Sequence, residues 1–453
     1  MICHGFRTFI KGAGRNVRVK TKNFGGNMRT SVSLRFTVAA TLAMLGGMVS
    51  GAQAADIRIA CYSDGNECPA TKTLADRFMK DNPDIHVTID EMPYKSILES
   101  VPVQLAAGNG PDIARISDFA QVAPYQLDLT PYLPDAAYWQ QAYGPVLDWM
   151  RTGPEDKGIY GLMTQLTVSA PLVNKTLFDQ AGVPSPAKGA TWDDWAAAVT
   201  KVAKATKTPF GMAWDRSGAR FSGPAISEGA KFFYSAGHPP VVDAGFKSMA
   251  AKFVQWNQDG TVDKDVWTST GGGYRDAFEE FANGKIAVYL SGSWQLARLQ
   301  KQIGDGFEWV VGDAPCGPGG CTGMPGGAGF VAFKGTKSPK EVAMFLDYLA
   351  SEPVYAEWMV MTSNLPANLD LQKKKLDYKL TPAGIAAMAQ FQANAASLSP
   401  IAYKMQGSAL SRPMFNATVD RLSQTIAGQI TLDQAYERIT SDVADAFAAK
   451  NKK

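Results

Sequence analysis

Residues 284–294 read Gly-Lys-Ile-Ala-Val-Tyr-Leu-Ser-Gly-Ser-Trp. Residues 286–290 combine β-branched and aromatic side chains between turn residues, which predicts a short buried strand. The Ser-Gly-Ser step that follows permits a sharp turn at Gly292, and Ser291 or Ser293 is expected to cap a helix over residues 295–303. Ligands of open α/β sheets bind beyond the carboxyl ends of strands. The stretch therefore places Trp294 at a ligand-binding edge.

The indole of Trp294 has two possible roles. A flat apolar ring at a strand end suits the C–H face of a sugar, whereas many tryptophans simply fill the core. The sequence of this stretch leaves both roles open.

Strands and helices alternate along the first part of the chain. Strands are predicted over residues 57–60, 85–89 and 111–117, with helices between them that end near Asn82-Pro83 and near Gly108. This order requires a parallel, doubly wound α/β sheet. A second set of strands begins at residues 209–213, and about 400 residues after the N-terminal segment are enough for two lobes.

Polar and aromatic groups follow several of these predicted strands. Asp64 follows the first strand, and Ser117 and Asp118 follow the third. Asp118 is either an acceptor for a ligand hydroxyl or a helix N-cap, and the same alternatives apply to Asp64. Trp214 and Asp215 come directly after the strand over residues 209–213, so the loops of both halves are expected to contribute to one site.

The first 54 residues have the features of an export signal. Arg29 and Arg35 precede a small apolar run over residues 36–49, and Ala52-Gln53-Ala54 is a small-x-small cleavage pattern. Cleavage is expected near Ala54, with Met28 as the initiator and residues 1–27 as a non-native upstream extension. The expected location is the periplasm.

The charge of the chain depends on this segment. The full chain has 45 basic and 42 acidic side chains, for a formal charge of +3. Eight of the basic residues lie within residues 1–54, so the remainder has 37 basic and 42 acidic side chains and a net charge of −5. A mildly acidic exported chain is not expected to bind nucleic acid through its charge.

Four cysteines remain after the N-terminal segment: Cys61, Cys68, Cys316 and Cys321. In an oxidising compartment two local disulfides, Cys61–Cys68 and Cys316–Cys321, are the simplest of the three possible pairings. A zinc site is the alternative, but the spacings do not match the short-loop zinc pattern. No metal and no cofactor are expected.

Two other classes of function compete with small-molecule binding. An exported carbohydrate-active enzyme would need a catalytic pair, yet Asp193-Asp194 and Glu279-Glu280 lie in predicted helices and neither His86 nor His238 adjoins a nucleophile motif. A peptide-binding or metal-binding module would need an acidic groove or a ligand cluster, and the sequence has neither pattern.

Seven short motifs follow one another along the chain. They are Asn82-Pro83-Asp84, Gly108 to Ile113, Asn174 to Gly182, Thr191 to Trp195, Gly284 to Trp294, Gly326 to Ala328, and Phe345 to Leu349. Taken together and in this order, they resemble the family-1 (maltose-binding-like) carbohydrate-binding proteins of bacterial ABC importers. The resemblance covers nearly all of residues 56–446.

This resemblance implies a two-lobe periplasmic-binding-protein fold in which each lobe is a doubly wound, mostly parallel sheet flanked by helices. Residues 55–166 and 330–362 would form lobe 1, and residues 167–329 and 363–453 would form lobe 2, joined by hinge crossings. The implied function is capture of a saccharide between the lobes by a monomer, which delivers it to permease subunits in the inner membrane.

The resemblance also implies a set of ligand-binding residues. Trp294 matches the stacking tryptophan, Asp118 lies in the region of the hydroxyl-binding acid, and Thr167 lies at the crossing. Together with the strand-end residues, the expected set is Ser63, Asp64, Ser117, Asp118, Thr167, Trp214, Asp215, Ser291, Gly292, Trp294, Arg412 and Phe415.

The chain also departs from the family pattern. Cys61 stands where tryptophan is frequent, and Phe415 stands where maltose binders use tryptophan, which argues against a maltooligosaccharide. Four arginines near the expected cleft could make it positively charged. The alternative ligand is therefore an anionic sugar derivative or a glycerol phosphate compound. These arginines are Arg115, Arg216, Arg220 and Arg412.

Overall fold

The computed structural model describes residues 54–153, 155–231, 242–269, 274–408 and 410–451. The expected signal peptide lies outside the described residues except for its last residue, so cleavage near Ala54 stays a prediction. His238 also lies outside them. None of the described helices is both long and apolar enough to cross a membrane.

The described residues contain one eight-stranded sheet whose main path is β2-β1-β3-β10-β4-β6-β5. Strands β1 (Ala55–Cys61), β2 (Ile85–Glu91) and β3 (Ile113–Ile116) are parallel to one another. Strands β5 (Phe210–Trp214) and β6 (Ile286–Gly292) are also parallel, and the short β7 (Trp309–Val311) pairs with β4. We refer to the part around β1, β2 and β3 as the first lobe and the part around β5, β6 and β7 as the second lobe.

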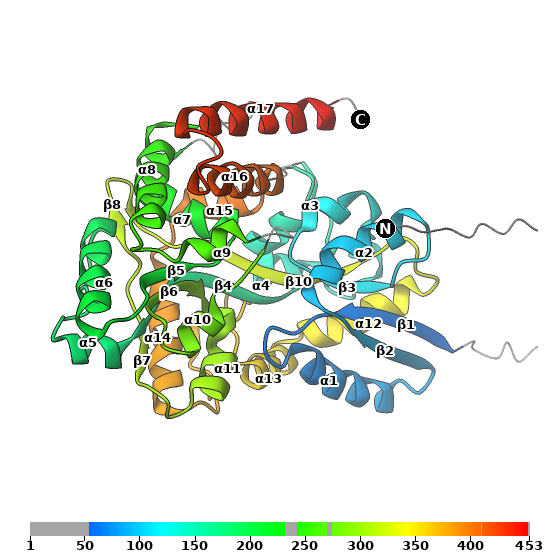
Figure 1. Ribbon diagram of the computed structural model, residues 1–453. Helices are drawn as coiled ribbons and strands as arrows, with labels where there is room; N and C mark the ends of the chain where they lie inside the picture. The colour runs from blue at the N-terminus through cyan, green and yellow to red at the C-terminus, as the bar shows by residue number, and fades with distance from the viewer. Residues whose placement is uncertain (1–53, 154, 232–241, 270–273, 409, 452–453) are drawn as a thin grey trace, which may run out of the picture. The chain divides into compact units, whose positions relative to one another are not determined.

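Two long strands run from one lobe to the other. β4 (Gly161–Asn174) and β10 (Pro325–Ala332) pair antiparallel with each other, and Figure 1 shows them between β1–β3 and β5–β6. All 14 residues of β4 are buried. At Gly327 a Cβ atom would come within 2.4 Å of the Gln165 carbonyl oxygen, so only glycine lets the two crossing strands approach this closely.

Helices cover the sheet in both lobes because one face of each is apolar. In α1 (Glu67–Asp81), for example, Leu74 and Phe78 are buried. The other helices of the first lobe are α2 (Tyr94–Ala106), α3 (Phe119–Val122), α4 (Ala136–Leu147), α12 (Pro339–Ala350) and α13 (Glu352–Thr362). Short 3-10 turns lie at Ala123–Tyr125, Thr130–Tyr132, Asp148–Met150 and Leu371–Lys373.

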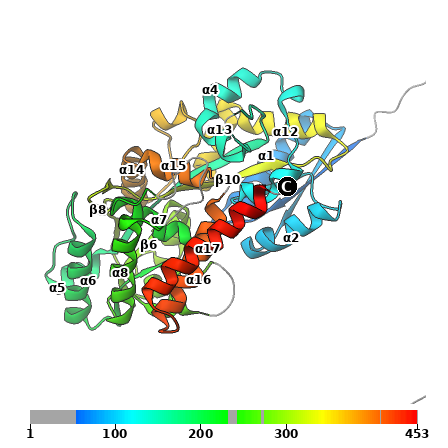
Figure 2. The same ribbon diagram turned by 90° about the horizontal axis from the view of Figure 1, so that it is seen from above.

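In the second lobe, α6 (Trp192–Thr206) begins with a capping box between Thr191 and Asp194. Trp192 and Trp195, which are neighbours on one face of this helix, are both buried. The remaining helices are α5 (Lys175–Ala181), α7 (Gly218–Ser227), α8 (Ala244–Gln258), α9 (Lys264–Thr268), α10 (Phe278–Ala282), α14 (Pro382–Ala396), α15 (Pro400–Gln406), α16 (Ser411–Ile426) and α17 (Leu432–Asn451). Figure 2 shows α16 and α17 side by side, and α16 packs on α7, α8 and α9.

The predicted helix after Trp294 is not a single α-helix. The chain forms a 3-10 turn at Ser293–Gln295, the short α11 (Leu296–Arg298), and a π-helical turn at Leu299–Ile303. The expected serine cap was also wrong, because both hydroxyls bond elsewhere. Ser291 Oγ donates to Asp215 Oδ2 at 2.7 Å, and Ser293 Oγ accepts the Val168 N–H at 3.2 Å.

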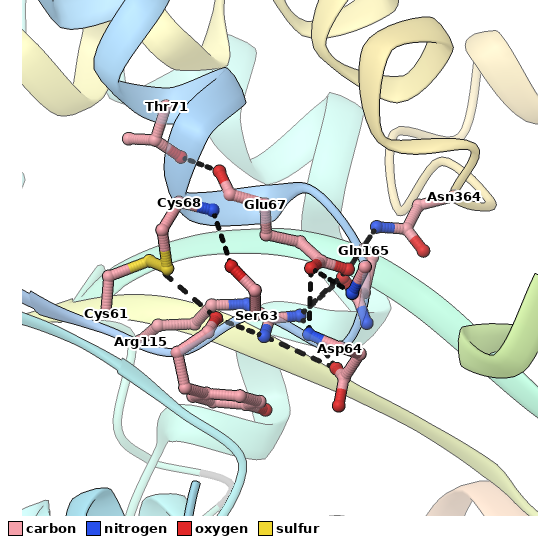
Figure 3. The surroundings of a disulfide bond; sticks show 11 residues. Cys61, Ser63, Asp64, Glu67, Cys68, Thr71, Arg115, Gln165 and Asn364 are labelled. Atoms are coloured by element: carbon pink, nitrogen blue, oxygen red, sulfur yellow. Dashed lines mark hydrogen bonds and ion pairs between the residues drawn. A yellow bond between two sulfur atoms is a disulfide. The ribbon is translucent and has the colours of Figure 1, made fainter. Parts of the chain in front are cut away.

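Two disulfides join cysteines that are close in sequence. Cys61 at the end of β1 is bonded to Cys68 in the first turn of α1 (Figure 3), where the Cys68 N–H also donates to Ser63 Oγ at 3.2 Å. Cys316 is bonded to Cys321 across the ladder of β8 (Cys316–Gly317) and β9 (Gly320–Cys321). Each bond closes a small loop, so its main effect is on loop shape.

Mass mapping of a non-reduced digest is expected to find the pairs Cys61–Cys68 and Cys316–Cys321. The same digest after reduction and alkylation serves as the control and should release all four cysteine peptides. Free thiols at all four positions, in protein prepared from an oxidising compartment, would contradict this pairing.

Candidate functional site

A cleft opens where the loops of both lobes meet the crossing strands. Its central chamber, of about 150 Å³, is lined from the first lobe by Tyr62, Asp64, Tyr94 and Ser117, and from the second lobe by residues 217–220, Tyr274 and Trp294. Crossing-strand residues Gln165, Thr167 and 325–327 and helical residues Gln406, Arg412, Phe415, Asn416 and Val419 complete the lining. A side chamber of about 410 Å³ shares Asp64, Tyr94, Tyr274 and Trp294 with it.

Trp294 lies in this cleft and is only partly buried. Gly292 makes room for it, because a Cβ atom at that position would lie 2.0 Å from Cζ3 of the indole. The Arg220 guanidinium carbon lies 4.4 Å from the centroid of the ring, which is a cation–π contact. The indole is therefore a surface of the cleft and not part of the core.

Further aromatic rings surround the central chamber. The rings of Tyr62 and Tyr94 lie 4.8 Å apart, and those of Tyr94 and Tyr274 meet edge-on at 6.0 Å across the cleft. Phe415 lines the chamber from α16. Together with Trp294, these rings give the chamber apolar faces that come from both lobes.

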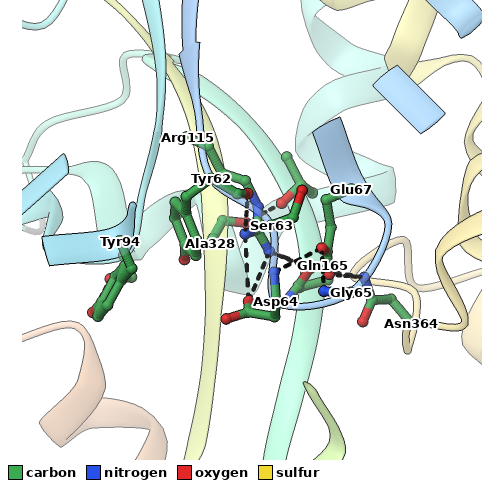
Figure 4. Close-up of polar contacts among 12 residues, drawn as sticks. Tyr62, Ser63, Asp64, Gly65, Glu67, Tyr94, Arg115, Gln165, Ala328 and Asn364 are labelled. Carbon is green, nitrogen blue, oxygen red and sulfur yellow. Dashed lines mark hydrogen bonds and ion pairs between the residues drawn. The ribbon is translucent and has the colours of Figure 1, made fainter. Parts of the chain in front are cut away.

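A buried arginine holds the loop that presents Asp64 (Figure 4). Arg115 on β3 has no exposed surface; it donates to the Tyr62 carbonyl oxygen at 2.8 Å and to Gln165 Oε1 at 2.6 Å. It pairs with Asp64 at 3.3 Å and with Glu67 at 3.7 Å. Glu67 in turn accepts the N–H groups of Asp64 and Gly65, each at 2.9 Å. Arg115 is thus a support behind the cleft.

Burial raises the pKa of Asp64 to about 6, while the positive charge of Arg115 lowers it and the negative charge of Glu67 raises it. At neutral pH most of the Asp64 carboxyl is ionised. It therefore offers an acceptor for a ligand hydroxyl, held in place by Arg115.

Asp118 and Arg412 connect the two lobes. Arg412 Nε on α16 donates to Asp118 Oδ2, after β3, at 2.8 Å. The Asp118 side chain caps no helix and does not line the central chamber, whereas Arg412 does. Of the two roles considered for Asp118, the side-chain N-cap is not formed, because its carboxylate pairs with Arg412, and the role of acceptor for a ligand hydroxyl stays a prediction. Its neighbour Ser117 lines the chamber and lies 2.9 Å from the Tyr94 hydroxyl.

Three residues expected to contact a ligand, Trp214, Asp215 and Ser291, do not line the central chamber. Trp214 has no exposed surface, and its ring stacks on Phe253 with 4.5 Å between centroids. Asp215, equally buried, accepts hydrogen bonds from Tyr289 Oη at 2.6 Å and Ser291 Oγ at 2.7 Å. Burial raises the pKa of Asp215 to about 6. Asp215, Tyr289 and Ser291 therefore form a buried hydrogen-bonded group outside the lining of the chamber, and Trp214 belongs to the core.

The remaining expected residues lie near the cleft. Thr167 lines the central chamber opposite Gly326, and Ser63 lines the side chamber. Among the described ranges, no group of three His, Cys, Asp or Glu side chains is placed to hold a metal.

A family model for bacterial extracellular solute-binding proteins matches residues 73–389. The chain belongs to this family. The Multiple sugar-binding protein of Streptococcus mutans is 24% identical over 315 residues, which cover 65% of this chain and 71% of that protein.

Solved structures show the same two-lobe fold. An ABC substrate-binding protein of Listeria monocytogenes in complex with cycloalternan has a TM-score of 0.71 at 19% identity, over 87% of this chain and 99% of that one. A cyclic alpha-maltosyl-1,6-maltose binding protein of Arthrobacter globiformis has a TM-score of 0.68 at 18% identity, over 86% and 98%. The residue boundaries of the two lobes stay a prediction.

Several cleft residues of this solute-binding protein were missed from the sequence. Tyr62, Tyr94, Gln165 and Tyr274 all line the central chamber. Tyr62 adjoins Ser63 in the loop after β1 and Tyr94 follows β2, so the rule that selected strand-end residues could have found both. Gln165 lies within a strand, and no sequence signal distinguishes it from the polar side chains beside it.

Proposed function

We propose that this solute-binding protein is the substrate-binding component of an ABC importer and captures a saccharide between its lobes. The observation that carries this is the central chamber, where a partly exposed tryptophan and three tyrosines stand beside hydrogen-bonding groups from both lobes. Aromatic faces suit the C–H surfaces of sugar rings, and Asp64, Ser117, Gln165 and Thr167 suit their hydroxyls. As proposed here, the mature protein is a periplasmic monomer that delivers its ligand to permease subunits.

The contacts between the lobes support capture by closure. The Asp118–Arg412 ion pair and the Tyr94–Tyr274 ring contact both join the first lobe to the second. A ligand that touches both lobes adds to these contacts, and it shifts the equilibrium by its differential affinity for the closed state.

Saccharide binding is expected to raise the melting temperature and to contract the protein. At a sugar concentration of 100 times Kd, the free energy of unfolding should rise by about 2.7 kcal/mol. A thermal-shift screen of saccharides identifies the ligand, and small-angle scattering with and without it measures the contraction. Trp294→Ala at the same sugar concentration is the control. An unchanged radius of gyration at saturating sugar would contradict the proposal that the lobes close around the ligand.

Binding without turnover is the proposed activity, because the carboxylate pairs considered for catalysis have structural partners. Asp194 bonds to Thr191 in the capping box and Asp193 pairs with Lys252 at 2.7 Å. Glu280 pairs with Arg275 at 2.7 Å, and Glu279 with Arg298 at 3.5 Å. Recovery of the bound sugar unchanged after incubation with the protein tests this point.

A further inference from the structure

The charged groups of the central chamber are not all paired. Of the side chains that line it, Asp64 pairs with Arg115 at 3.3 Å and Arg412 pairs with Asp118 at 2.8 Å. Arg220 also lines the chamber, and within the described residues it makes no ion pair. Its Nε and Nη1 atoms are buried and have no hydrogen-bond partner. Arg220 as a whole is partly buried, but buried guanidinium N–H groups without an acceptor are costly unless a partner arrives.

Within the described residues, no ion pair joins Arg220 to the Asp215 carboxylate. Asp215 already accepts hydrogen bonds from Tyr289, Ser291 and the Ala277 N–H group. Burial lowers the pKa of Arg220, and the charge of Asp215 acts against this. On its other side the guanidinium lies over the Trp294 ring at 4.4 Å, which supplies no hydrogen-bond acceptor in the plane of the guanidinium.

The N-terminal end of α7 adds to the positive charge of Arg220 in the chamber. Arg220 lies in the first turn of α7, and Ser217, Gly218 and Ala219 line the same chamber. The first N–H groups of a helix have no intrahelical acceptor and carry a partial positive charge. The Ser217 side chain does not cap them. Oxyanions bind at such helix ends.

We propose that the ligand carries an oxyanion on its sugar, and that Arg220 and the first turn of α7 bind that group beside Trp294. This inference rests on the proposed saccharide function and narrows it to sugars bearing a carboxylate, sulfonate or phosphate. Arg220 presents planar donors that match two oxygens of such a group. Of the other arginines considered from the sequence, Arg115 is engaged behind the cleft, Arg216 lies outside the central chamber, and Arg412 is paired.

The test measures calorimetric affinity for glucose, glucuronate, glucose 6-phosphate and 6-deoxy-6-sulfoglucose. At least one anionic sugar is expected to bind about 10- to 100-fold more tightly than glucose, as one or two charge-assisted hydrogen bonds provide. That preference should shrink as salt rises. In Arg220→Gln it should fall by about tenfold or more, with glucose binding changed much less.

Two variants control for other causes. Arg58→Gln removes the same charge from a half-exposed site on β1 and should keep the preference. Arg220→Lys keeps the positive charge but lacks the planar guanidinium, so it should keep part of the preference for anionic sugars. The melting temperature without ligand shows whether each variant folds. Equal or tighter binding of glucose than of every anionic sugar would overturn the anion site and leave the saccharide function standing. Failure of all four sugars to bind would count against both proposals.

Discussion

Replacing Arg115 by methionine is expected to lower the free energy of unfolding by about 3–5 kcal/mol, the usual cost of breaking a buried ion pair. Arg115 has no exposed surface and is the positive partner of Asp64 and Glu67. Methionine fills much of the same space but removes the donor to the Tyr62 carbonyl oxygen and leaves Gln165 Oε1 with the Asn364 amide as its donor. Urea denaturation measures the loss.

Arg77→Met is the matched control for this substitution. Arg77 makes two 2.8 Å hydrogen bonds to Glu357, but both side chains are nearly half exposed, so about 0–1 kcal/mol should be lost. Equal losses for the two variants would contradict the supporting role of Arg115.

The loss in Arg115→Met should also depend on pH. Without Arg115 the pKa of Asp64 in the folded protein rises above its value of about 6. The difference in free energy of unfolding between wild type and Arg115→Met therefore has its full size above the pKa of Asp64 in the variant. It shrinks as pH falls from that pKa toward 6 and below. Denaturation at pH 8 and pH 5 tests the sign, and a larger loss at pH 5 would refute this account.

Trp294→Ala and Trp214→Ala are expected to have opposite effects. Trp294 is partly exposed in the cleft, so its truncation should weaken saccharide binding by about 1–3 kcal/mol with little loss of stability. Trp214 is fully buried against Phe253 and Trp192, so its truncation should cost about 3–5 kcal/mol of stability.

Affinity by calorimetry and melting without ligand, measured on both variants, separate the two roles. The Trp214→Ala protein that remains folded should bind the sugar with near-normal affinity. A stable Trp294→Ala protein with unchanged affinity would rule out stacking of the ligand on this indole. A strongly destabilised Trp294→Ala protein would indicate that Trp294 is a core residue.

The order of strands and helices could be predicted because local patterns determine it. The strand predicted over residues 85–89 is β2, and the helix predicted to end near Asn82-Pro83 is α1, which ends at Asp81. These signals lie within a few residues of the feature that they predict.

The direction of side chains at strand ends could not be predicted in this way. Trp214 is the last residue of β5 and pairs with Leu290, so the pleat turns its ring into the core. Trp294 lies beyond the end of β6, where the chain is free of the pleat. Whether Asp215 meets a ligand or a buried tyrosine depends on Tyr289 and Ser291, which are more than 70 residues away. Partners at that distance leave no local signal.

The space above Gly292 also constrains how this protein can evolve. Any side chain at position 292 would occupy the place of the Trp294 ring, so one substitution there removes the indole from the cleft while residue 294 itself is unchanged. A lineage that lost this glycine could not recover the aromatic surface by mutating position 294 alone. We therefore expect positions 292 and 294 to change together, and ligand preference at this end of the cleft to change in discrete steps.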